Sequence, residues 1–128
     1  MSHDNLKQRT KDFALRVIRL SGPMPRSIPG DVLSRQIFRS ATSVAANYRS
    51  ACRGKSRADF IAKMGIVEEE ADEPALWLEM IAEAKLLPEA KTAALQAEAG
   101  ELTAIAVSSI RTARAGRSTL QSAVRTPH

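Results

Sequence analysis

The sequence has little cysteine, few aromatic residues and no long apolar run. Its one cysteine, Cys52, excludes a disulfide within the chain. No apolar run approaches the roughly 20 residues that cross a bilayer, and the N-terminus lacks a signal-peptide core. We therefore expect a cytoplasmic protein with no membrane partner. With three Phe, one Trp and one Tyr, the interior must be filled by aliphatic residues, Ala and Met, which is typical of helix bundles.

Histidine is also scarce, and its placement argues against two kinds of catalytic site. The two histidines, His3 and His128, lie near the ends of the chain. The hydroxyl groups at 40–43 therefore have no histidine within reach for a nucleophilic triad. The acidic run 68–73 lacks the Glu-x-x-His partners of di-metal helix bundles, and no Gly-rich phosphate loop is present. We expect no cofactor, no metal and no enzymatic activity.

The most regular pattern lies in residues 36–53, which contain no Gly or Pro. At about 100° per residue, one face of a helix here collects an apolar seam: Leu33, Ile37, Ala41, Val44, Tyr48 and Ala51. The opposite face collects four arginines: Arg35, Arg39, Arg49 and Arg53. The pattern predicts a helix with one face in a core and a stripe of guanidinium groups on the other.

The N-terminal part of the chain predicts a first amphipathic helix over 4–20. Its apolar side carries Leu6, Phe13, Val17 and Leu20, widened by Ala14 and Ile18. The stretch 21–30 contains three prolines and two glycines, so no helix should pass through it. The second helix should begin near Asp31 and end near Arg53.

Two further helices are expected in the C-terminal half. Ser56 and Asp59 form a capping box that opens a third helix, which should extend to about Leu86 with a kink before Pro74. A fourth helix should have Pro88 in its first turn and end at a C-cap, Gly116. The predicted fold is an all-α, antiparallel, up-down-up-down four-helix bundle over 1–116, with a disordered tail over 117–128.

This topology predicts where the positive charges behind the net charge of +5 lie in the folded chain. Antiparallel order should gather cations from distant parts of the sequence at one end of the bundle. They are Lys7, Arg9, Lys11, Arg49, Arg53, Lys55, Arg57, Arg111, Arg114 and Arg117. The acidic residues of 68–101 should occupy the middle and the other end.

A basic surface of this kind can bind the phosphate backbones of RNA or DNA through salt-sensitive contacts. The residues that we expect to contact phosphates are Arg35, Arg39, Arg49, Arg53, Lys55 and Arg57. Two alternatives stay open. The cations can complement helix dipoles, or they can pair with the acidic segment of another protomer in a protein-interaction or scaffold module.

Two features admit both a structural and a functional interpretation. Ser40, Ser43 and Asn47 flank the apolar seam, which favours close packing or hydrogen bonding against a neighbouring helix over ligand contact. Trp77 lies between two leucines, which favours a place in the core or a subunit interface over base stacking.

Several motifs resemble one known family. The stretch Gln36 to Tyr48, written QIFRSATSVAANY, resembles the signature of the 23S ribosomal RNA intervening-sequence protein family, which are four-helix bundles. Residues 56–60 are similar to that family's entry into its third helix, and 65–78 to its acidic block and Trp-Leu close. The resemblance covers roughly residues 10–112.

The resemblance implies a homopentameric ring of bundles with no established catalytic activity. Similarity to the accessory protein of diversity-generating retroelements further implies nucleic-acid binding. Two departures are the Arg49-Ser50 pair, where many members carry a Glu, and Pro74, which replaces a helix-compatible residue.

Overall fold

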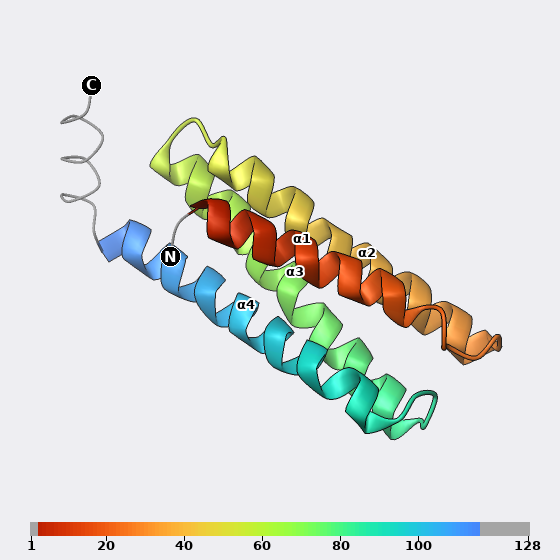
Figure 1. Cartoon of the computed structure of the whole chain (residues 1–128). Helices are drawn as coiled ribbons and strands as arrows, with labels where there is room; N and C mark the ends of the chain where they lie inside the picture. The colour runs from red at the N-terminus through yellow and green to blue at the C-terminus, as the bar shows by residue number, and fades with distance from the viewer. Residues whose placement is uncertain (1–2, 116–128) are drawn as a thin grey trace.

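The computed structural model describes residues 3–115, which form four helices (Figure 1). Their bounds are α1 His3–Leu20, α2 Ile28–Cys52, α3 Arg57–Glu83 and α4 Glu89–Ala115. This part of the chain contains no strand. Consecutive helices run in opposite directions (Figure 1), so the predicted all-α, up-down-up-down bundle is confirmed. The expected C-cap Gly116 and the expected tail 117–128 lie outside the described residues.

The four helices are not packed equally. α3 packs extensively against both α2 and α4, whereas α1 packs mainly against α2 and makes fewer contacts with α4. The fully buried side chains include Phe13 of α1, Ile37 of α2 and Met64 and Leu78 of α3. α1 is therefore the most peripheral of the four helices.

The predicted apolar seam of α2 is confirmed. All six of its residues are buried, and Ser40 joins them with no exposed surface. On α1, Leu6, Phe13, Val17 and Leu20 are buried as expected. Ala14 is also buried, but the side chain of Ile18 is 44% exposed, so its assignment to the seam was wrong. The buried stripe of α1 is therefore narrower than predicted.

The second helix begins at Ile28, three residues earlier than predicted. Ser27 is its N-cap, and its hydroxyl accepts a hydrogen bond of 3.1 Å from the N–H of Gly30. Pro29 is tolerated because it lies in the first turn of α2, where a backbone N–H would have no carbonyl partner within the helix. Gly30 is buried, and a Cβ atom there would lie 2.2 Å from the carbonyl oxygen of Pro25. Close approach of two backbone segments therefore requires glycine.

The N-terminus of α3 has the predicted cap in a modified form. The hydroxyl of Ser56 accepts a hydrogen bond of 3.0 Å from the N–H of Asp59. The carboxylate of Asp59 accepts its reciprocal bond, also 3.0 Å, from the N–H of Lys55. This backbone hydrogen bond, with the nearby ammonium of Lys63, lowers the pKa of Asp59 below its ordinary value.

α3 continues through the buried Pro74 as one helix, as predicted. It ends at Glu83, three residues before the expected end, and Lys85 adopts a left-handed backbone with φ of 60°. Pro88 precedes α4, and its carbonyl accepts a hydrogen bond of 2.9 Å from the N–H of Lys91. It therefore lies just before the first turn and not within it.

Candidate nucleic-acid interface

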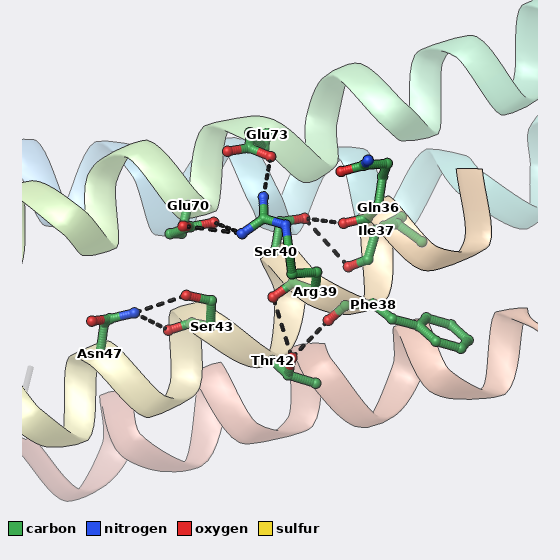
Figure 2. Close-up of polar contacts among 10 residues, drawn as sticks. All are labelled: Gln36, Ile37, Phe38, Arg39, Ser40, Thr42, Ser43, Asn47, Glu70 and Glu73. Carbon is green, nitrogen blue, oxygen red and sulfur yellow. Dashed lines mark hydrogen bonds and ion pairs between the residues drawn. The ribbon is translucent and has the colours of Figure 1, made fainter. Parts of the chain in front are cut away.

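The arginine stripe of α2 divides between two neighbouring helices. Arg39 turns towards α3: its Nη1 lies 3.3 Å from both carboxylate oxygens of Glu70, and its Nη2 lies 2.6 Å from Oε1 of Glu73 (Figure 2). Glu70, and then Glu73, raise the pKa of Arg39 above its ordinary value by hydrogen bonding and by charge. Arg39 therefore links α2 to α3, and acidic residues of the same chain match its charge.

The C-terminal arginines of α2 lie instead beside α1. They line a groove between the two helices, which we call the α1–α2 groove; its lining residues are Lys7, Lys11, Thr42, Ala45, Ala46, Arg49 and Arg53. Lys11, Arg49 and Arg53 are exposed, and Lys7 is half-buried. None of these four cations forms an ion pair with a side chain that the structure describes.

Helical spacing brings the four cations together. Lys7 and Lys11 are four residues apart on α1, and Arg49 and Arg53 are four residues apart on α2, so each pair projects from one face. The start of α1 lies beside the end of α2 because the helices are antiparallel (Figure 1). Like charges repel at this separation. An anion placed between them would relieve that repulsion.

The six residues predicted to contact phosphates do not form one cluster. Arg49 and Arg53 line the α1–α2 groove. The exposed Lys55 and half-buried Arg57 follow in the connection to α3 and its first residue, at the same end of the bundle. Arg35 is exposed on α2. At 1.5 Å per residue, it lies about 27 Å along the helix from Arg53.

Two cations of the groove were absent from that predicted set. The sequence interpretation placed Lys7 and Lys11 at the basic end but did not include them among the phosphate contacts. Their four-residue spacing is the signal that could have found them, since it puts both on one face of α1. Which neighbouring helix that face meets depends on the helix pairing and is not contained in the spacing.

The other cations of the basic end are distributed over different faces. Arg9 of α1 turns towards α4, where its Nη2 lies 2.6 Å from Glu98 and 3.6 Å from Glu101. Arg111 and Arg114 of α4 line a separate surface depression with Glu68 of α3. Arg117 lies beyond the described residues. The α1–α2 groove gathers four cations, and its described lining contains no acidic residue.

The polar residues beside the seam of α2 bond to their own helix. The hydroxyl of Ser40 donates to the carbonyls of Gln36 and Ile37, at 3.1 and 3.3 Å. The amide of Asn47 donates to the carbonyl and hydroxyl oxygens of Ser43, at 2.9 and 2.8 Å (Figure 2). The full burial of Ser40 agrees with the expected close packing, but these hydrogen bonds stay within α2 and do not reach a neighbouring helix.

Trp77 packs against the hydrophobic core and is partly buried. Its indole Nε1 is buried and has no hydrogen-bond partner within the described part of the chain. The ring contributes to the packing between helices, as the structural interpretation expects. It is absent from the α1–α2 groove.

The described part of the chain, residues 3–115, bears on metal ligands and membrane spans through its side chains and its four helices. No cluster of three or more His, Cys, Asp or Glu side chains there is arranged to hold a metal ion. None of the four helices there combines the length and apolar character that a membrane span requires.

Comparison with known proteins gives a family and a solved structure. The family model described as "23S rRNA-intervening sequence protein" matches residues 4–108. A crystal structure from Bacteroides thetaiotaomicron, described as a protein of unknown function from the S23 ribosomal protein family, superposes with a TM-score of 0.76. Its sequence is 33% identical, and the match covers 83% of this chain and 98% of that one. No curated protein matches the chain.

Proposed function

The chain belongs to the 23S rRNA-intervening sequence protein family, and from that premise we propose that it is a non-enzymatic protein that binds the backbone of RNA or DNA. The proposed binding surface is the α1–α2 groove. The observation that carries the proposal is the juxtaposition of Lys7, Lys11, Arg49 and Arg53 with no ion-pair partner among the described side chains. Lys55 and Arg57 extend the same positive end.

The ion pairs of arginines elsewhere in the bundle support the choice of the α1–α2 groove as the binding surface. Arg39 and Arg9 are each held by carboxylates of a neighbouring helix. Their charges stabilise helix pairing and are less available to a ligand. The groove cations have no comparable partner, so their hydration and counterions can be exchanged for phosphates. The described lining of the groove also contains no aromatic ring, which favours binding without base preference.

A salt-titrated binding assay tests the proposal. Structured RNA, single-stranded DNA and heparin are each titrated with the full chain between low and moderate salt. We expect binding to RNA and DNA that weakens steeply with salt and exceeds binding to heparin. Absence of binding to both nucleic acids at low salt would contradict the proposal.

A second function, self-assembly, is favoured by the outer face of α3. Ile66, Leu76 and Met80 are large apolar residues that are 42%, 49% and 43% exposed. They recur on one side of the helix, within about 80° at 100° per residue. Apolar groups on one helical face favour contact with a protein surface. We propose that a second copy of this chain covers them in a homo-oligomer, with the homopentamer implied by the family resemblance as its size.

Light scattering tests this assembly directly. A pentamer has a mass of roughly 70 kDa, five times the 13.9 kDa of one chain. Leu76→Asp together with Met80→Asp should lower the measured mass, because charges would be buried in the interface. Replacement of Arg19 by Asp, on the exposed surface of α1, is the control. A monomer mass for the unmodified chain at micromolar concentration would contradict the assembly.

A further inference from the structure

We infer that the α1–α2 groove accepts one strand of a nucleic acid at a time, and therefore prefers single strands to duplexes. This inference rests on the proposed function and deepens it by naming the class of ligand. It is drawn from the two-walled arrangement of cations, the acidic residues beside them on α4 and the lining of the groove floor.

The cations form two parallel pairs. Lys7 and Lys11 stand on the α1 wall, and Arg49 and Arg53 stand on the α2 wall. Within each pair the attachment points are about 6 Å apart along the helix axis. Two packed helices have axes about 8–10 Å apart. A phosphodiester strand that runs along the groove would place consecutive phosphates between cations from both walls.

Acidic residues bound this basic strip on the side of α4. On α2, Glu70 and Glu73 of α3 hold Arg39, which lies about 15 Å along the helix from Arg49, beyond one end of the strip. On the far side of α1, Glu98 of α4 holds Arg9, with Glu101 nearby. A duplex carries a second phosphate strand across each of its grooves, the wider of which is about 12 Å wide. A second strand on the side of α4 would lie over Arg9, whose charge Glu98 already matches, so on that side only one strand gains from the contact.

The floor of the groove offers little to a base. Ala45 and Ala46 have no polar side-chain atom, and the hydroxyl of Thr42 already donates to the carbonyl of Phe38 at 2.7 Å. None of the described residues that line the groove is aromatic. Base edges therefore find no built set of donors, and base faces find no stacking platform. The strand is held by its phosphates, with the bases directed away from the floor.

Fluorescence anisotropy with labelled 20-nucleotide probes tests the inference. The probes are oligo-dT, oligo-U and a 20-base-pair DNA duplex of mixed sequence, each titrated with the full chain over a range of salt concentrations. We expect both single strands to bind at least about tenfold more tightly than the duplex. Four phosphate contacts on a single strand predict a slope of log affinity against log salt of about −2.8.

Variants on the α1 wall separate the groove from general positive charge. Lys7→Ala with Lys11→Ala should halve the salt slope for oligo-dT, to about −1.4, because two of four contacts are removed. Arg19→Ala with Arg35→Ala removes the same charge from exposed positions outside the groove lining and should leave the slope unchanged. Circular dichroism confirms that both double variants fold.

The outcomes distinguish this inference from the proposed function. Equal or tighter binding of the duplex, or an unchanged slope in the Lys7 and Lys11 variant, overturns the single-strand preference and leaves backbone binding in place. Failure of every probe to bind overturns the proposed function, and this inference with it. Both the proposed function and this inference are supported if single strands bind more tightly than the duplex and the salt slope is halved in the Lys7 and Lys11 variant but not in the control variant.

Discussion

Arg9 and Glu98 form a two-point ion pair between α1 and α4, although they are 89 residues apart in sequence. Nε of Arg9 lies 3.0 Å from Oε2 of Glu98, and Nη2 lies 2.6 Å from Oε1. The two side chains are only 24% and 16% exposed. The hydrogen bond to Glu98 raises the pKa of Arg9 above its ordinary value. Since α1 has few other contacts with α4, this pair is a main link between them.

Removal of this pair should weaken the bundle. Arg9→Ala leaves the half-buried carboxylate of Glu98 without its partner and should lower the free energy of unfolding by about 1–2 kcal/mol. Urea denaturation followed by circular dichroism measures the change. Arg19→Ala, an exposed position on the same helix, is the control and should change stability by less than about 0.5 kcal/mol. Equal effects of the two substitutions would refute a special role for the pair.

Charge reversal in the α1–α2 groove should abolish nucleic-acid binding. Arg49→Glu with Arg53→Glu replaces two phosphate contacts by two repulsive charges, so binding to RNA should be lost even at low salt. Both side chains are exposed, and the variant should keep its helical circular dichroism spectrum. An electrophoretic mobility assay at low salt measures the effect. Retained affinity in a folded variant would remove the groove as the binding surface.

The N-terminal cap of α3 should make stability depend on pH. The pKa of Asp59 is lowered in the folded chain, chiefly by the hydrogen bond from the N–H of Lys55. Its ionised form therefore stabilises the fold above the unfolded pKa of about 4, and this contribution disappears as pH falls below that value. Asp59→Asn should flatten the decrease in melting temperature between about pH 5 and pH 3.

The control for this pH measurement is Asp72→Asn, which changes an exposed carboxylate on the same helix. It should retain the pH dependence of the unmodified chain. If Asp59→Asn and the unmodified chain lose stability in parallel, the hydrogen bond from Lys55 does not contribute in the predicted way.

Two glycines should respond to alanine in opposite directions. Gly30→Ala would place a Cβ atom 2.2 Å from the carbonyl oxygen of Pro25, and the resulting backbone shift should cost about 1–3 kcal/mol. Gly65→Ala lies within α3 with nothing in the way of the new methyl group. It should stabilise the chain by about 0.5–1 kcal/mol through a higher helix propensity. Thermal denaturation compares the two, and destabilisation by Gly65→Ala would contradict the argument.

The fold was predictable because one pattern dominates each helix. The seam of α2, from Leu33 to Ala51, repeats at helical spacing, and periodicity of this kind identifies a buried face directly. The start of α2 was misplaced because proline and glycine were taken as helix breakers. The structure uses Pro29 where an N–H is dispensable and Gly30 where a side chain would collide with Pro25. Pro29 follows a local rule for helix starts, whereas the need for Gly30 comes from the path of the folded chain past Pro25.

The candidate site was predicted only in part, for a related reason. A helical wheel places Arg39 and Arg49 on one outward face. In the structure, Arg39 forms ion pairs with carboxylates of α3, whereas Arg49 lines a groove with two lysines of α1. The two residues differ by about 80° around the helix. That difference decides which neighbour each side chain reaches once the bundle is assembled. A wheel drawn for one helix contains no information on the position of its neighbours.

The peripheral packing of α1 ties ligand affinity to the local stability of that helix. Lys7 and Lys11 belong to the helix with the fewest contacts to the rest of the bundle, so detachment of α1 would dismantle one wall of the groove. A polyanion that engages both walls must then suppress this opening, by thermodynamic linkage. Amide protons between residues 6 and 18 should exchange with deuterium more slowly in the complex, and every substitution that loosens α1 should weaken binding without touching the ligand.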